Sequence, residues 1–229
     1  MASITLSALR DSTRQRSDMV NSQFVTDVEL NGYINASLAE LYDLLVSSFE
    51  DYYSSQTTLT TDGITDSVPL PSDFYKMRGV DAAQNPANNQ WLTLRRFNFN
   101  ERNVLNRGVT PTSLGLPSLR YLVFGNTLKL TPLPPANITL RAYYIPTITY
   151  LALDTDAFNF ISGFEEYVII DASIKCMQKE ESDVSILALQ KQAIIKRIQD
   201  MAPNRDAGEA AHISDVSAQD PQGGNRGWY

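Results

Sequence analysis

The side chains that could perform acid–base or nucleophilic chemistry are few and far apart in this chain of 229 residues. His212 is the only histidine, and it lies in a polar C-terminal stretch that offers no rigid support for a general base. Cys176 is the only cysteine, and its apolar neighbours at helical spacing indicate a small buried side chain rather than a nucleophile. One histidine and one cysteine cannot supply a tetrahedral zinc site. We therefore predict no catalytic residue, no metal and no cofactor.

The carboxylates that stand out are two adjacent pairs and one aspartate within an apolar segment. Consecutive residues of a helix point about 100° apart, so neither Glu165-Glu166 nor Glu180-Glu181 can converge on one metal ion or substrate. Asp171 is the aspartate that lies among apolar residues. We interpret it as a structural group, hydrogen-bonded to a tyrosine, an arginine or the backbone, with a functional carboxylate as the alternative.

Three arginines, Arg10, Arg14 and Arg16, follow one another at the end of an N-terminal helical segment. Such a cluster could contact phosphates, but Asp11 and Asp18 lie beside it. The whole chain carries a net charge of −7, the opposite of the balance found in proteins that bind nucleic acid through its backbone. We therefore predict that these arginines form ordinary surface or a subunit interface.

The composition describes a folded chain with one large domain or two small ones. Hydrophobic residues make up 43% of it, which is enough for a core of ordinary size. The N-terminal sequence MASITLSALRDSTRQR lacks the apolar region of a secretory signal. No apolar run approaches the roughly 18 residues that a membrane span needs. We expect a soluble protein made in a cytoplasm, with no membrane contact.

Two helical segments are predicted at the N-terminus. The first covers residues 3–18, where apolar residues are so few that the helix needs a partner surface. The second begins at a capping box formed by Thr26 and Glu29 and extends to near Tyr53. Its apolar face contains Leu30, Ile34, Leu38, Leu41 and Leu45.

The middle of the chain changes to short β-type runs that Gly and Pro separate. The clearest is RYLVFGNTLKLTP (120–132), a hairpin with its turn at Gly125-Asn126. We predict four or five antiparallel strands in all. The interval 95–119 favours a helix at its start and a loop at its end. The remaining β-type runs are 57–61, 68–74, 75–82, 91–94 and 137–146.

Two further helices are predicted between Gly163 and Met201, joined by a turn of about three residues near Asp183 and packed antiparallel. The first is apolar almost all round, which indicates burial. The second has a narrower apolar face, and Lys191 lies outside that face.

The predicted fold class is therefore α+β. N-terminal helices and a C-terminal antiparallel helical hairpin surround a small, mostly antiparallel β-domain, and an extended tail follows. The predicted domains are 1–55 (N-terminal helices), 56–150 (β-rich domain), 156–201 (helical hairpin packing with the N-terminal helices) and 202–229 (C-terminal arm).

Residues 202–229 differ in character from everything before them. Only four of them are large and apolar, namely Ile213, Val216, Trp228 and Tyr229, too few to offset the entropy of ordering the segment. Fully extended, residues 202–229 would span some 90 Å. A folded domain of about the size of this chain has a radius of gyration of only about 17 Å. We predict an arm that lies along a neighbouring molecule and is anchored by these side chains. An idle disordered tail is the alternative.

The order of these elements resembles that of a known family. The β region holds LPSDFYKMRGVDA and RYLVFGNTLKLTP, then comes YYIP, and then FEEYVIIDASIKCMQKEESD leads to a helix ending in QDMAPNRDAGEA. Over residues 20–205 this resembles the head-to-tail adaptor of tailed bacteriophages, also called connector, tail tube adaptor or head completion protein. It is similar to the adaptors of short-tailed phages, where helices surround a small β-domain.

The resemblance implies a virion structural protein without catalytic residues. Such adaptors form a ring, usually of twelve copies, beneath the portal protein at one capsid vertex, and present a docking surface to the tail or nozzle protein. In several of them a C-terminal extension reaches the portal, which is the role implied for residues 202–229. Genomic DNA passes through the ring without specific binding, and an acidic conduit would let it slide.

Other functions stay open at this point. Another neck or tail component, such as a stopper or nozzle subunit, would share the structural character. A soluble binding module with unrelated partners is a second alternative. An enzyme acting through Asp and Glu, a lysozyme or nuclease for example, is a third and predicts a pocket with converging carboxylates.

Overall fold

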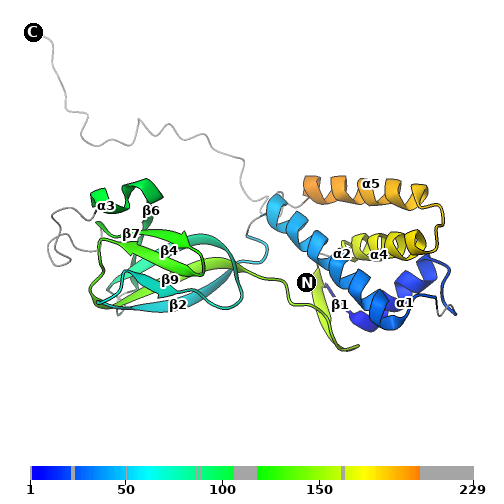
Figure 1. The fold of residues 1–229 in the computed structure, drawn as a ribbon, viewed down its shortest axis with the longest axis horizontal. Coiled ribbons are helices and arrows are strands. Elements are labelled where there is room, and N and C mark those ends of the chain that lie inside the picture. The colour runs from blue at the N-terminus through cyan, green and yellow to red at the C-terminus, as the bar shows by residue number, and fades with distance from the viewer. Residues whose placement is uncertain are drawn as a thin grey trace, which may run out of the picture.

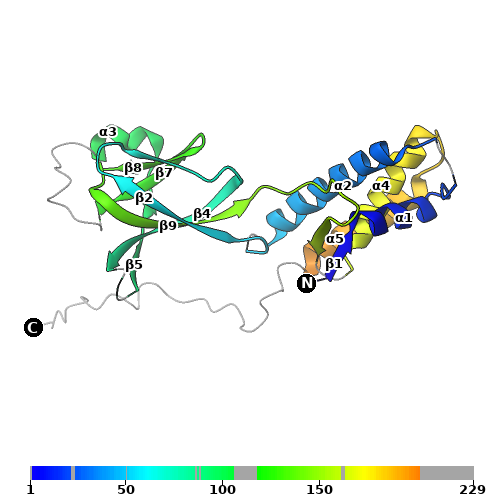
Figure 2. The same cartoon turned by 90° about the horizontal axis from the view of Figure 1, so that it is seen from below.

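Helices and strands separate into two lobes at opposite ends of this protein, as its computed structural model shows (Figure 1, Figure 2). The helical lobe contains both the N-terminal elements and the last helix of the described residues, and the β lobe is built from the middle of the sequence. The α+β class is therefore confirmed. The structure describes residues 2–21, 24–49, 51–85, 87, 89–105, 118–160 and 163–201.

The helical lobe combines four long helices with a two-stranded ribbon. In the ribbon, β1 and β10 pair antiparallel, with Ser3 opposite Asn159. Helix α4 packs against α1, α2 and α5 and so occupies the middle of the lobe. The elements are β1 (Ala2–Thr5), α1 (Leu6–Arg16), α2 (Asp27–Ser48), β10 (Ala157–Phe160), α4 (Glu165–Lys179) and α5 (Ser185–Met201).

Threonine side chains set where the first two helices begin. The Thr5 hydroxyl accepts a hydrogen bond from the Ala8 N–H at 3.3 Å, so α1 starts only after it. The prediction of a helix from residue 3 was wrong because residues 2–5 pair with β10 instead. Thr26 caps α2 through the Glu29 N–H at 3.3 Å, as the sequence predicts. The predicted end of this helix near Tyr53 was wrong, because α2 ends at Ser48 and Phe49 has an extended backbone conformation.

The β lobe consists of two four-stranded sheets, with strand orders β2-β9-β4-β5 and β3-β8-β7-β6. All neighbours pair antiparallel except β6 and β7, which run parallel. The first sheet contains β2 (Ser55–Asp62), β9 (Ala136–Pro146), β4 (Phe74–Asn85) and β5 (Gln90–Thr93). The second contains β3 (Ser67–Pro69), β8 (Thr127–Thr131), β7 (Arg120–Phe124) and β6 (Arg95–Arg96).

The hairpin predicted from the Gly125-Asn126 turn is confirmed. Phe124 pairs with Thr127 across a two-residue turn, and Gly125 has the positive φ of 56° that such turns require. The number of strands in the middle of the chain was underestimated, because the two sheets of the β lobe contain eight among the described residues. The start of the interval 95–119 holds β6, a 3-10 turn (Phe99–Glu101) and the short helix α3 (Arg102–Leu105). Residues 106–117 lie outside the described part.

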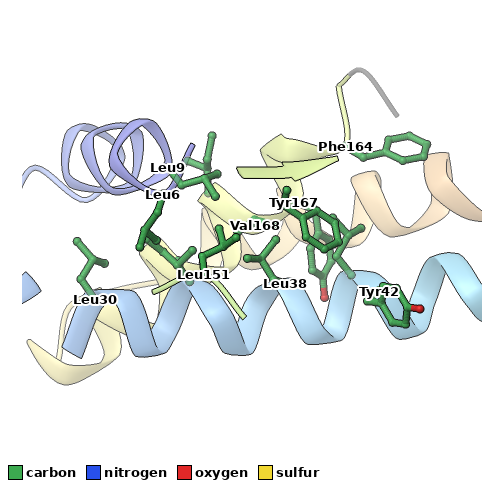
Figure 3. Close-up of a cluster of buried hydrophobic side chains, with 14 of the residues drawn as sticks. Leu6, Leu9, Leu30, Leu38, Tyr42, Leu151, Phe164, Tyr167 and Val168 are labelled. Atoms are coloured by element: carbon green, nitrogen blue, oxygen red, sulfur yellow. The ribbon is translucent and has the colours of Figure 1, made fainter. Parts of the chain in front are cut away.

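Each lobe has its own hydrophobic core. In the helical lobe, leucines of α1 and α2 interlock with α4 and with Leu151, as Figure 3 shows for Leu9, Leu38 and Val168. In the β lobe the two sheets face each other across Val80, Leu128 and Leu140. Because these clusters share no residue, each lobe buries its apolar surface independently.

Three polar contacts join the lobes where α2 ends. The Tyr42 hydroxyl donates to the backbone oxygen of Pro146, the last residue of β9. Asp43 accepts a hydrogen bond from Tyr75 at 3.1 Å, and Asp51 forms an ion pair with Arg78 at 2.6 Å. Burial raises the pKa of Tyr42 to about 12, so this hydroxyl remains a donor over the physiological pH range.

The core of the helical lobe gives a direct test of the fold. Replacing Leu38, which is fully buried, with Ala should lower the free energy of unfolding by about 2–5 kcal/mol, because a cavity remains at the centre of the lobe. Urea unfolding followed by circular dichroism measures this. The matched control is Leu189→Ala in α5, where the leucine is 68% exposed and the change should stay within about 0.5 kcal/mol. Equal losses in the two variants would contradict the described packing.

Candidate functional site

A cluster of hydrogen-bonded charged side chains lies among α2, α4 and α5. Its centre is Asp171, whose side chain is only 4% exposed. One carboxylate oxygen accepts from the Ser37 hydroxyl at 2.6 Å and from Lys175 at 2.5 Å. The other accepts from Lys191 at 2.6 Å. Asp171 is therefore hydrogen-bonded, but the predicted partner types were wrong, because serine and lysine take the places assigned to tyrosine, arginine or backbone.

Glu40 completes this group from the α2 side. It forms ion pairs with Lys175 at 2.9 Å and Lys191 at 3.1 Å, and it accepts a hydrogen bond from the Tyr167 hydroxyl at 3.2 Å. Two carboxylates and two ammonium groups thus balance one another. We call Ser37, Glu40, Asp171, Lys175 and Lys191 the helix-bundle network.

The helix-bundle network stabilises the charged forms of its acidic and basic groups, which does not favour proton transfer between them. Burial alone would raise the pKa of Asp171, but the hydrogen bonds from Lys175, Lys191 and Ser37 outweigh burial and hold that pKa below its usual value. The pKa of Lys191 is raised, because its carboxylate partners overcome the desolvation that opposes its charge. Both groups therefore stay charged at neutral pH, which suits a structural tie between helices.

Sequence reasoning placed Lys191 on the outer face of its helix, and this was wrong. A lysine can bend its flexible stem over apolar neighbours to reach a charge, and the ammonium of Lys191 also lies 5.3 Å from the Tyr167 ring. The Asp171–Lys175 pair has i,i+4 spacing, so that half of the network could have been read from the sequence. The Asp171–Lys191 contact depends on how α5 packs against α4, which local spacing does not predict.

The three N-terminal arginines are paired within the chain. Arg10 forms an ion pair with Asp154 at 2.7 Å, and Arg14 pairs with Asp27 at 2.7 Å. Arg16 pairs with Glu166, at the start of α4. These contacts tie α1 to the elements around it. A role of Arg10, Arg14 and Arg16 at a subunit interface stays a prediction.

The other candidates for chemistry lie apart from one another. Cys176 is buried, and burial raises the pKa of its thiol to about 11, so it is a thiol and not a thiolate at neutral pH. Of the adjacent glutamates, Glu165 accepts from the Gly163 N–H at 2.7 Å, whereas Glu166 faces α1. His212 and the predicted anchors Ile213, Val216, Trp228 and Tyr229 lie outside the described residues.

A groove of about 430 Å³ follows the junction of the two lobes. Tyr42 and Tyr53 stack in its wall with ring centroids 4.6 Å apart, and the exposed Tyr150 stands at its side. Tyrosines are side chains that protein–protein contacts favour.

Within the described ranges, no group of three or more His, Cys, Asp or Glu is arranged to hold a metal ion. Among the helices that the structure describes, none is both long and apolar enough to cross a membrane.

The described residues thus form two separately packed lobes joined by polar contacts. The model of the SU10 adaptor protein family matches residues 4–215, and the chain belongs to this family. This is a family of phage adaptors, so the chain is a structural component of a phage virion. The resemblance to a phage head-to-tail adaptor is thereby confirmed. No curated protein matches the chain significantly.

The helix-bundle network predicts a measurable loss of stability. Asp171→Asn should lower the free energy of unfolding at pH 7 by about 1–3 kcal/mol, because two lysines lose their shared buried partner. The pKa of Asp171 lies below the ordinary 3.8 in the folded state, so its contribution is present above about pH 4 and is lost as the pH falls further.

Urea unfolding at pH 7 and at pH 3 tests both statements. The difference between wild type and Asp171→Asn should shrink at the lower pH. Glu181→Gln is the matched control, since Glu181 is exposed on the turn after α4, and it should behave as wild type at both pH values. A variant with unchanged stability at pH 7 would show that the network contributes nothing.

Proposed function

We propose that this protein forms the ring that joins the portal to the tail and extends the DNA channel. The observation that carries this proposal is the match to the adaptor family over 4–215. The elongated two-lobed shape supports it, because one lobe can pack beside its copies while the other faces the next component of the neck (Figure 1). A ring of identical copies uses heterologous contacts, in which different patches of one chain meet.

The division of labour follows the predicted domains. We assign ring packing to the helices of 1–55 and 156–201, which the helix-bundle network and the arginine ion pairs consolidate. We assign the tail or nozzle side to the β-rich domain, 56–150, and portal attachment to the arm, 202–229. The separate hydrophobic cores of the two lobes support this division. The proposed role requires no catalysis and no cofactor.

Genomic DNA is proposed to pass through the ring without specific binding. The net charge of −7 supports this, since repulsion of phosphates keeps a passing duplex from adhering to the wall. The portal vertex of the virion is the proposed location, and the host cytoplasm the place of synthesis.

The arm is proposed to grip the portal. It starts after Met201, at the end of α5 that points toward the β lobe (Figure 1). An extended segment of this length can cross a neighbouring subunit completely. Its few large side chains, Ile213, Val216, Trp228 and Tyr229, are then the groups whose burial in a partner offsets the cost of ordering the arm.

Deleting residues 202–229 should leave the two lobes folded but abolish stable attachment to the portal. The measurement is co-sedimentation of purified full-length and truncated chains with portal-bearing heads that lack adaptor. Circular dichroism and a urea midpoint close to that of the full chain confirm that the truncated chain is folded. Equal attachment of both chains would refute the role of the arm.

The terminal aromatic pair should carry part of that attachment. Trp228→Ala with Tyr229→Ala should weaken portal binding by about 2 kcal/mol or more, roughly 30-fold in affinity, if both rings are buried anchors. Titration of portal-bearing heads with labelled adaptor measures this. The control is Asp220→Asn in the same arm, which should bind within about threefold of wild type. Binding by the aromatic variant that matches the control would exclude Trp228 and Tyr229 as anchors.

A further inference from the structure

Charge is unevenly divided along this acidic chain. Residues 56–150 contain nine Lys and Arg against five Asp and Glu, a net charge of +4. The remainder of the chain contains ten Lys and Arg against 21 Asp and Glu, which gives a net charge of −11. The β lobe is therefore basic and the rest of the chain is acidic. Opposite charge on two parts of one chain is a condition for copies of it to attract each other in one orientation.

Three of the nine basic residues of this region lie at one edge of a sheet. Strand β6 pairs parallel with β7 so that Arg95 lies beside Arg120, and Arg96 follows at the same edge. Arg95 and Arg96 are exposed and Arg120 is half-buried. No acidic side chain of the described residues forms an ion pair with any of these three.

Two exposed aromatic rings follow these arginines along the chain, Phe99 three residues after Arg96 and Phe124 four residues after Arg120. Phe99 is 47% exposed and Phe124 is 57% exposed, and their rings stack with centroids 5.8 Å apart. The Arg102 guanidinium lies 4.1 Å from the centre of the Phe99 ring. Exposed phenylalanines stacked with arginine are typical of the residues that dominate protein–protein interfaces. We call Arg95, Phe99, Arg102, Arg120 and Phe124 the basic–aromatic face.

The opposite end of the molecule carries a complementary surface. The loop after α1 and the turn between α4 and α5 both lie at the end of the helical lobe that points away from the β lobe, in both views (Figure 1, Figure 2). Asp18, Glu180, Glu181 and Asp183 are exposed there. None of them forms an ion pair with a described lysine or arginine.

Apolar side chains accompany these acids. Ile186, in the first turn of α5, is 70% exposed, and Phe24, just before α2, is half exposed. We call Asp18, Phe24, Glu180, Glu181, Asp183 and Ile186 the acidic tip. It offers carboxylates to arginines and apolar contact to phenylalanines, which are the groups that the basic–aromatic face presents.

We propose that the basic–aromatic face of one copy binds the acidic tip of the next copy. The contact is heterologous, so repeating it generates a ring when the rotation closes. The inference rests on the proposed ring and adds, to the packing of its helices, one contact that an edge of the β lobe makes with the next copy. A second copy is the favoured occupant because charge and apolar surface match on both sides, whereas duplex DNA would match the arginines alone.

Charge exchange between the two surfaces tests the contact. The first variant carries Arg95→Glu and Arg120→Glu, the second carries Glu180→Lys and Glu181→Lys, and the third carries all four substitutions. The control, Lys76→Glu with Lys196→Glu, changes the net charge as the first variant does, at exposed lysines outside both surfaces. Full-length chains are titrated onto portal-bearing heads that lack adaptor, and the bound copies per head are counted.

The first and second variants should each need about tenfold more protein than wild type to complete the ring. A mixture of the two, and the third variant alone, should recover to within about threefold, because each restored contact again joins opposite charges. The control should match wild type. Raising the salt concentration should weaken wild-type assembly. Recovery by the third variant also shows that the four substitutions permit folding.

Other outcomes overturn the inference. Loss in the first variant without recovery in the mixture would mean that the face binds a different protein. Unchanged ring assembly with lost binding to a labelled DNA duplex would assign the face to DNA. Normal assembly of every variant would remove both surfaces from the interface while leaving the proposed ring intact. Failure of wild type to bind the heads at all would instead refute the proposed function.

Discussion

The buried carboxylate of Asp171 is the interaction on which the rest of the helical lobe depends. Helix α5 contributes one fully buried side chain to the core, Ile198, and Ile194 and Ile195 pack against the core partly buried. The ion pair between Asp171 and Lys191 supplies a second, directional tie to α4. Since the proposed portal arm begins where α5 ends, this tie also fixes the point from which the arm leaves the protein.

The neck between the lobes plays a similar part at the scale of the whole molecule. Two hydrophobic cores that share no residue could rotate against each other. The contacts of Tyr42 with Pro146, Tyr75 with Asp43 and Arg78 with Asp51 resist such rotation. A subunit whose two ends keep a fixed relation can set the spacing between the components that it joins.

The sequence predicted the elements whose signals are local. The Thr26 cap, the Gly125-Asn126 hairpin and the apolar helix around Asp171 all follow from neighbouring residues, whereas the resemblance to phage adaptors rests on the order of the elements. It did not predict the β1–β10 ribbon, because its strands are more than 150 residues apart and short, nor the turning of Lys191 toward Asp171, which depends on how α5 packs. The assembly surfaces combine residues from separate segments, so spacing along the chain gives no signal of them.

Electron cryo-microscopy of purified virions at the portal vertex tests the central claim most directly. The account predicts a closed ring of this chain directly beneath the portal, with density for residues 202–229 running along the portal surface. Absence of the chain from that vertex would contradict the proposed function. So would a ring in which residues 202–229 fold back onto the helical lobe of their own chain and leave the portal untouched.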